Sequence, residues 1–231
     1  TVTAANLLPI YYIYYETGDR LNCSDENPFS ITIVPKPVAY PVNPLESCDT
    51  FGANDGVFQF DLTTLAIRNQ VLNGQFPDID FTLSFFTSLA AANNANAVPI
   101  ANPADYQNDN PFSDSVWIRV ANNTIPNACF DVVELPMIIN QLPVIQLLPD
   151  YYICEDYKTG TLLNPATLDT GITATNYIFD WTLNGNPFGG NTASITTSQI
   201  GTYAVRVTNT NTNCINISST IVSKYAPYLE I

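Results

Sequence analysis

Short runs of alternating apolar and polar residues recur along the chain, and they are rich in Val, Ile, Tyr and Phe. A period of two places every second side chain on the same face, which is typical of β-strands with one buried face. Clear examples are residues 57–60, 81–86 and 177–181. Only residues 88–96, with their Leu-Ala-Ala-Ala run, favour a helix. We therefore expect an all-β fold with one short helix.

A hairpin pattern occurs three times. In each copy an apolar strand is followed by an Asn-rich turn with a cysteine, and then by a second strand that ends near a proline. The copies comprise residues 11–15, Cys23 and 29–34; residues 116–120, Cys129 and 132–139; and residues 203–207, Cys214 and 217–222. Repeats of this kind indicate tandem domains, each closed by its hairpin.

The spacing of the hairpins divides the chain into three parts. Units of roughly 100 residues built from short strands have the size of a β-sandwich. We expect the C-terminal strands of a truncated domain in residues 1–40, a β-sandwich domain in 41–144 and a second one in 145–231, arranged as a rod. Prolines are frequent in residues 35–44, which disfavours a flexible linker at the first joint.

Five cysteines lack any C-x-x-C pair, which argues against a zinc site and favours disulfides in an oxidising, extracytoplasmic location. Each complete unit has one cysteine near its start and one near its end. This layout predicts the disulfides Cys48–Cys129 and Cys154–Cys214. Cys23 then pairs with a cysteine that lies before Thr1, so the chain is expected to be a piece of a longer protein.

Charge and composition exclude several function classes. The net charge of −14 repels phosphate backbones, which argues against nucleic-acid binding. The absence of histidine removes Ser-His-Asp and Cys-His catalysis. The sequence contains no run of about 18 apolar residues, so it predicts no membrane-spanning helix. The acidic pairs Asp78 with Asp80 and Glu155 with Asp156 come without a third polar partner, so we interpret them as solvated surface and expect no enzyme.

One acidic loop is a candidate metal site. It contains Asp49, Asn54, Asp55 and Asp61, and hard oxygen ligands of this kind bind Ca²⁺. Counting back from Gly56, however, puts Ala53 and Phe51 at two of the positions that a calcium loop fills with ligands. The alternative is an Asx-rich turn that caps a strand, with no cofactor. Both interpretations stay open at this point.

The middle unit resembles the repeat domains of giant Bacteroidota cell-surface adhesins of the Flavobacterium type. The resemblance rests on Cys48-Asp49, Asn54-Asp55-Gly56, residues 58–63, residues 102–108, Trp117-Ile118-Arg119-Val120 and Cys129-Phe130-Asp131. The last unit resembles an immunoglobulin-like or polycystic-kidney-disease-type module, with Trp181 and Gly201-Thr202-Tyr203 at the expected places. It departs from the immunoglobulin pattern at Val205, where a cysteine would be expected.

These resemblances imply a function. Such adhesins serve gliding motility or surface attachment, are exported by the type IX secretion system and stand on the outer membrane as long filaments that hold an adhesive tip. The chain would then be a non-catalytic module whose partners are neighbouring modules and surface glycans or cell-surface proteins. The alternative is a glycan- or protein-binding accessory module of a secreted enzyme, which an exposed, coplanar aromatic pair would support.

Overall fold

The computed structural model describes residues 11–16, 24–29, 36–52, 54–75, 80–126, 129–173 and 175–225. Packing divides the chain into two compact units. Unit 1 consists of Thr1–Val42, Leu65–Ala101 and Trp117–Glu134, and unit 2 consists of Asn43–Thr64, Asn102–Val116 and Leu135–Ile231. Two long strands run through both units, so the packing units do not test the predicted domain boundaries, which stay a prediction.

Unit 1 contains a hairpin and a sheet flanked by two helices. Strands β1 (Tyr11–Glu16) and β2 (Ser24–Phe29) pair antiparallel, with Tyr11 opposite Phe29. Strand β5 (Phe81–Phe86) pairs antiparallel with β7 (Ser113–Asn122), which is followed by β8 (Phe130–Asn140). Cys23 and residues 30–35 of the first predicted hairpin lie outside the described residues.

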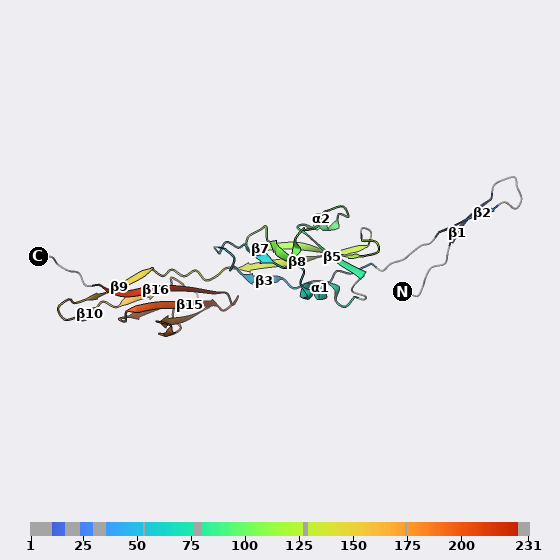
Figure 1. Ribbon diagram of the computed structural model, residues 1–231. Coiled ribbons are helices and arrows are strands. Elements are labelled where there is room, and N and C mark those ends of the chain that lie inside the picture. Colours follow the sequence, from blue (N-terminus) through green and yellow to red (C-terminus); the bar gives the residue numbers. More distant parts are fainter. Residues whose placement is uncertain are drawn as a thin grey trace. The chain divides into compact units, whose positions relative to one another are not determined.

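The two helices of unit 1 lie on either side of this sheet in Figure 1. Helix α2 (Leu89–Asn93) confirms the predicted helix, and the side chain of Ser88 accepts a hydrogen bond from its Ala91 N–H. Helix α1 (Leu65–Leu72) was not predicted. Its apolar residues point both ways, since Ile67 and Val71 are buried while Leu65 is exposed. The sequence therefore lacks a clear helical stripe here.

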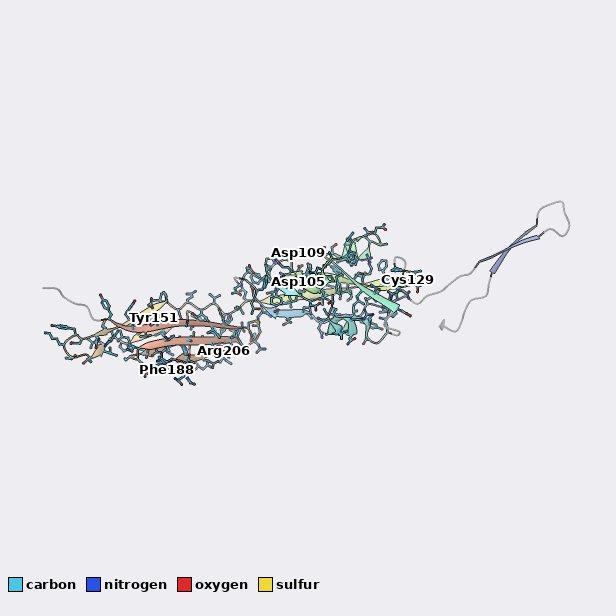
Figure 2. The ribbon with its side chains drawn as sticks, viewed as in Figure 1. Asp105, Asp109, Cys129, Tyr151, Phe188 and Arg206 are labelled. Atoms are coloured by element: carbon cyan, nitrogen blue, oxygen red, sulfur yellow. A yellow bond between two sulfur atoms is a disulfide. The ribbon has the colours of Figure 1, made fainter. Side chains whose placement is uncertain are left out.

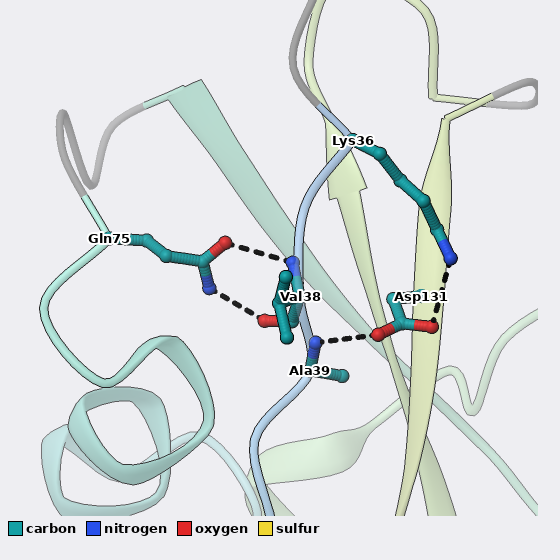
Figure 3. A network of polar contacts seen from close by, with 5 residues as sticks. All are labelled: Lys36, Val38, Ala39, Gln75 and Asp131. Carbon is teal, nitrogen blue, oxygen red and sulfur yellow. Dashed lines mark hydrogen bonds and ion pairs between the residues drawn. The ribbon is translucent and has the colours of Figure 1, made fainter. Parts of the chain in front are cut away.

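Residues 36–39 are hydrogen-bonded to other parts of unit 1 (Figure 3). Gln75 bonds both backbone groups of Val38, accepting from its N–H at 2.8 Å and donating to its carbonyl at 2.6 Å. Asp131 accepts from Ala39 N at 3.0 Å and forms an ion pair with Lys36 at 3.4 Å. Residues 36–39 are thus held in place by these contacts as well as by the fixed φ of Pro37.

Unit 2 begins with a short strand that completes the first sheet. Strand β3 (Leu45–Cys48) runs parallel to the end of β8, with Leu45 opposite Met137 and Cys48 opposite Asn140. The four-stranded sheet has the order β3-β8-β7-β5. A small ladder pairs β4 (Gln59–Phe60) with β6 (Tyr106–Gln107), after the 3₁₀ turn η2 (Pro103–Asp105).

The rest of unit 2 is a β-sandwich. One sheet has six strands in the order β10-β9-β16-β15-β12-β13, and β11 with β14 forms the second. The bounds are β9 (Asp150–Glu155), β10 (Leu162–Leu163), β11 (Ala166–Asp169), β12 (Tyr177–Leu183), β13 (Asn186–Pro187), β14 (Ser194–Thr197), β15 (Gly201–Asn209) and β16 (Ile215–Tyr225). The first strand, β9, is parallel to the last, β16.

Alternating side chains from both sheets form the sandwich core. Trp181 is buried as predicted and donates its indole N–H to the carbonyl of Thr192 at 2.9 Å. Tyr203 is fully buried, and its hydroxyl lies 2.9 Å from the carbonyl of Gln199, four residues upstream. This corner is a hallmark of immunoglobulin-like sandwiches. Val205 and Leu168 share the same apolar core. The predicted all-β, immunoglobulin-like fold is confirmed.

Candidate functional site

The site that the structure singles out is a disulfide between Cys48 and Cys214, whose Cα atoms are 5.5 Å apart. Cys48 is the last residue of β3, and Cys214 directly precedes β16. The bond therefore joins the first strand of one sheet to the closing turn of the sandwich that follows it. Cys214 is fully buried, which shields the bond from attacking thiols.

The predicted disulfides Cys48–Cys129 and Cys154–Cys214 are wrong, and strand direction explains why. Cys48 pairs with Asn140 at the C-terminal end of β8, while Cys129 precedes the first residue of that strand. The eleven residues of β8 span about 35 Å. Disulfide geometry requires Cα atoms within about 7 Å. Two cysteines at opposite ends of one strand therefore cannot bond.

The same geometry separates Cys154 from Cys214. Cys154 lies opposite Tyr225, near the end of β16, while Cys214 lies before its start. Cys154 is exposed and Cys129 is half-buried, and neither has a disulfide partner among the described residues. Figure 2 labels Cys129 at its turn. Only two of the four predicted disulfide cysteines are thus joined here.

Each unbonded cysteine occupies the same structural position as a bonded one. Asn122 ends β7 and donates its N–H to the carbonyl of Cys129 at 3.0 Å, and Asn209 ends β15 and donates to Cys214 at 2.9 Å. In both hairpins this bond closes the turn directly before the second strand. Cys48 and Cys154 match in the same way, because both lie near the end of a first strand that runs parallel to the last one.

Hydrogen bonds hold the chain beside the disulfide, where β8 ends. The carbonyl of Asn140 accepts from Asp49 N at 2.8 Å. The Asn54 side chain bonds both backbone groups of Leu142, at 2.8 and 3.2 Å. Asn216, on β16, donates its side-chain N–H to the carbonyl of Pro143 at 2.8 Å. The bonded sulfur of Cys214 carries no hydrogen, so its 3.8 Å approach to Asn140 is a van der Waals contact.

Residues of the predicted calcium loop serve this local structure. Asn54 adopts a left-handed φ of 60° and is committed to Leu142. Asp61 is exposed and accepts from the hydroxyl and the N–H of Thr63, and these two bonds lower its pKa from the ordinary value. Asp55 accepts from Val57 N at 3.1 Å. These are Asx-turn contacts of the kind that the alternative interpretation expects.

Asp49 is the exception among the four. It is 1% exposed, and one carboxylate oxygen accepts from Gly56 N at 2.5 Å, while the other has no hydrogen-bond partner in the described part of the chain. Within the described residues, no three Asp, Glu, Cys or His side chains form a group that could hold a metal ion. Among the four predicted ligands, Asp49 is therefore the one that combines burial with an unpartnered carboxylate oxygen.

Two residues of the motifs that carry the resemblance, Asn108 and Gly56, organise the same loop. Asn108 is buried, accepts from Phe58 N at 2.7 Å and donates to the carbonyl of Gly56 at 2.9 Å. Gly56 has a φ of +82°, and a Cβ at this position would lie 2.6 Å from the backbone nitrogen of Phe112. The motifs that contain Gly56 and Asn108 thus have a packing role, which a polar residue pattern alone could not reveal.

No helix in the described ranges is long and apolar enough to cross a lipid bilayer. Two exposed Tyr side chains, Tyr152 and Tyr225, are in contact, with ring centroids 6.2 Å apart. Their planes meet at 71°, so they do not form a flat platform.

Among solved structures, the chain is similar to tandem immunoglobulin domains. The N-terminal four domains of Dscam1 isoform 6.9 match with 13% identity over 97% of this chain and 56% of that one (TM-score 0.32). Titin fragment I67–I69 matches with 11% identity over 64% and 56% (TM-score 0.32). Three domains of the bacteriophage RB49 protein Hoc match with 14% identity over 63% and 48% (TM-score 0.30). The chain thus spans about half the length of these structures.

No curated protein matches the chain. Residues 44–143 match a protein family described as the Flavobacterium inter-domain disulphide bond domain. This match supports a Flavobacterium-type origin, and the description agrees with the position of the Cys48–Cys214 bond, which starts inside the matched segment and ends in the following sandwich. This family description favours a structural module.

Proposed function

We propose that this chain is a non-catalytic part of an extracellular filament in which successive β-sandwiches are joined covalently by disulfides. The observation that carries the proposal is the Cys48–Cys214 bond between the first strand of one sheet and the closing turn of the next sandwich. A disulfide that spans 166 residues of sequence cannot serve a single hairpin. It ties one β-structured segment to its successor.

The unbonded cysteines extend the same rule to neighbours in a longer chain. Cys154 has the first-strand position of Cys48, so its partner is the closing-turn cysteine of a following module. Cys129 has the closing-turn position of Cys214, so its partner is the first-strand cysteine of a preceding module. Each module would then carry one disulfide to each neighbour, and no cysteine would remain unpaired inside the filament.

Location and biological role follow from this proposal and from the resemblance to adhesins. Disulfides persist in oxidising environments, so the filament is extracellular. A net charge of −14 keeps such a filament soluble at the cell surface. Export by the type IX system, gliding motility or attachment, and surface glycans or cell-surface proteins as ligands of the tip belong to the same proposal. The crossed Tyr152 and Tyr225 rings do not favour a glycan-binding accessory module.

A tandem protein tests the disulfide rule. A second copy beginning at Lys36 would follow Tyr225 of the first copy directly. The segment before its β3 would then match in length the segment between β8 and β9. We expect non-reducing peptide mapping to find Cys154 of the first copy bonded to Cys129 of the second, besides Cys48–Cys214 in each. A matched tandem with Cys154→Ala in the first copy should lose only the bond between the two copies. Free thiols at Cys154 of the first copy and Cys129 of the second in the oxidised tandem would contradict the proposal.

A further inference from the structure

We propose a mechanical function for the Cys48–Cys214 bond: it carries tension past the folded core, so that residues 49–213 bear no load when the chain is pulled from its ends. The covalent path enters along β3, crosses the disulfide and leaves along β16. The helices and strands from β4 to β15 lie between these two cysteines, in a loop that the disulfide closes and that is outside the path of the force. The inference needs only this one bond and does not depend on bonds to neighbouring modules.

The position of the disulfide at the strand ends makes the path short. Cys48 is the last residue of β3, so the bond begins where that strand stops. Cys214 lies one residue before Ile215, so the path continues straight into β16. Force on the ends of the chain therefore passes along two strands and one covalent bond between them.

The two strands under load, β3 and β16, can lengthen very little when they are pulled. A β-strand rises 3.2–3.4 Å per residue, and a fully extended chain reaches only about 3.3–3.6 Å per residue. Strand β16 is hydrogen-bonded on both sides, antiparallel to β15 and parallel to β9. Because β15 and β9 lie inside the closed loop, pulling on β16 does not pull them in the opposite direction. Their hydrogen bonds to β16 are therefore not sheared.

Without the disulfide the load would take a different route. It would pass from β3 through the whole first sheet to β8, and then from β9 through the sandwich to β16. In both parts the strands at the two ends of the path are parallel neighbours, β3 with β8 and β9 with β16. Tension would then shear these ladders and unfold the segments they close. The 166 residues of separation would lengthen the chain by about 550–600 Å.

Single-molecule stretching of the full 231-residue chain, with handles at both ends, tests this inference. Three proteins are compared: the oxidised natural sequence, Cys48→Ala with Cys214→Ala, and the control Cys129→Ala with Cys154→Ala. Residues 1–44 and 226–231 lie outside the bypass and contribute equally in all three. Peptide mapping of each preparation first establishes which cysteines are bonded.

We expect the double variant of Cys48 and Cys214 to gain about 550–600 Å of contour length over the natural protein, in discrete unfolding events. The control should stretch like the natural protein. An equal total length in the natural protein and the Cys48/Cys214 variant would overturn the inference. So would peptide mapping that finds Cys48 and Cys214 unbonded in the natural protein. Loss of bonding at Cys129 or Cys154 in a tandem protein would contradict the proposed filament and leave this result unchanged.

Discussion

The hairpins β7–β8 and β15–β16 share a sequence pattern but differ in what surrounds them. Each has an arginine between apolar residues in its first strand and a cysteine before its second. Arg119 on β7 is 6% exposed, whereas Arg206 on β15 lies at the surface and pairs with Asp180 at 3.2 Å (Figure 2). The difference arises because helix α2 covers the outer face of β7, while the outer face of β15 is open.

Burial gives Arg119 a structural task that Arg206 lacks. Its guanidinium donates to the carbonyls of Ala91, Ala92 and Asn94 at the end of α2, at 2.6–3.0 Å. It also lies over the rings of Phe86 and Phe130, 4.3 and 4.8 Å from their centroids. Desolvation lowers its pKa from the ordinary value. Arginine at the same place in the pattern thus binds the end of helix α2 in one hairpin and forms a surface ion pair in the other.

The cysteines show a parallel contrast. Cys214 is bonded and fully buried, whereas Cys129 in the equivalent turn has no disulfide partner among the described residues. The turn geometry is alike in both, so the hairpin itself does not decide whether the cysteine is bonded. Under our proposal, what decides it is whether a first-strand cysteine from the preceding module reaches the turn.

Removing the disulfide should have the largest effect on stability. In the chain-entropy model, opening a loop of 166 residues destabilises the folded state by up to about 5 kcal/mol. We therefore expect Cys48→Ala with Cys214→Ala to lower the free energy of unfolding in urea by several kcal/mol. Cys154→Ala, at an exposed and unbonded position, should change it by less than about 0.5 kcal/mol. Equal effects of the two changes would contradict this assignment.

The arginine contrast predicts the next largest difference. Arg119→Ala leaves three carbonyls without their charged donor and should destabilise by about 3 kcal/mol. Arg206→Ala removes one exposed ion pair and should cost at most about 1 kcal/mol. Trp117 lies on β7 and Trp181 on β12, so single Trp→Phe backgrounds let fluorescence follow each region during unfolding. Arg119→Lys should recover only part of the loss, because lysine lacks the planar fork.

Two glycines with similar positive φ allow the cost of steric overlap to be measured separately from the cost of backbone strain. Gly56 and Gly185 have φ of +82° and +80°, but a Cβ at Gly56 meets the backbone of Phe112 while a Cβ at Gly185 meets nothing within 4 Å. Gly185→Ala should therefore cost about 1 kcal/mol, from backbone strain alone. Gly56→Ala should cost about 2–3 kcal/mol, since overpacking is added. Thermal unfolding of both variants gives the comparison, and equal costs would show that the loop around Gly56 relaxes freely.

Calcium should have the smallest effect. Asn54 and Asp61 already form hydrogen bonds, and among the buried carboxylate oxygens of the described part of the chain only Oδ1 of Asp49 has no hydrogen-bond partner. We propose that the loop is an Asx-rich turn and expect millimolar Ca²⁺ to raise stability by less than about 0.5 kcal/mol. This corresponds to about 1–2 °C in the melting temperature. A larger rise in melting temperature that Asp49→Asn abolishes would support the calcium site instead.

Strand positions were the most predictable part of the fold. Strand β5 has the predicted bounds, residues 81–86, and the predicted helix at 88–96 appears as α2. Helix α1 escaped prediction because its apolar residues do not form one stripe. The sequence nevertheless marks the C-terminal end of α1. Asn73 and Gly74 adopt left-handed φ values of 45° and 78°, which is typical of a helix C-terminus.

The sequence by itself determined the all-β class, the hairpins β7–β8 and β15–β16 and the presence of disulfide chemistry, because alternation and turn residues act over a few neighbouring positions. The partner of Cys48 was decided only by the tertiary structure. A first strand that runs parallel to the last one places its cysteine far from the turn of its own hairpin and next to that of the following sandwich. Strand direction is a long-range property, and it also decides which covalent route a pulling force takes.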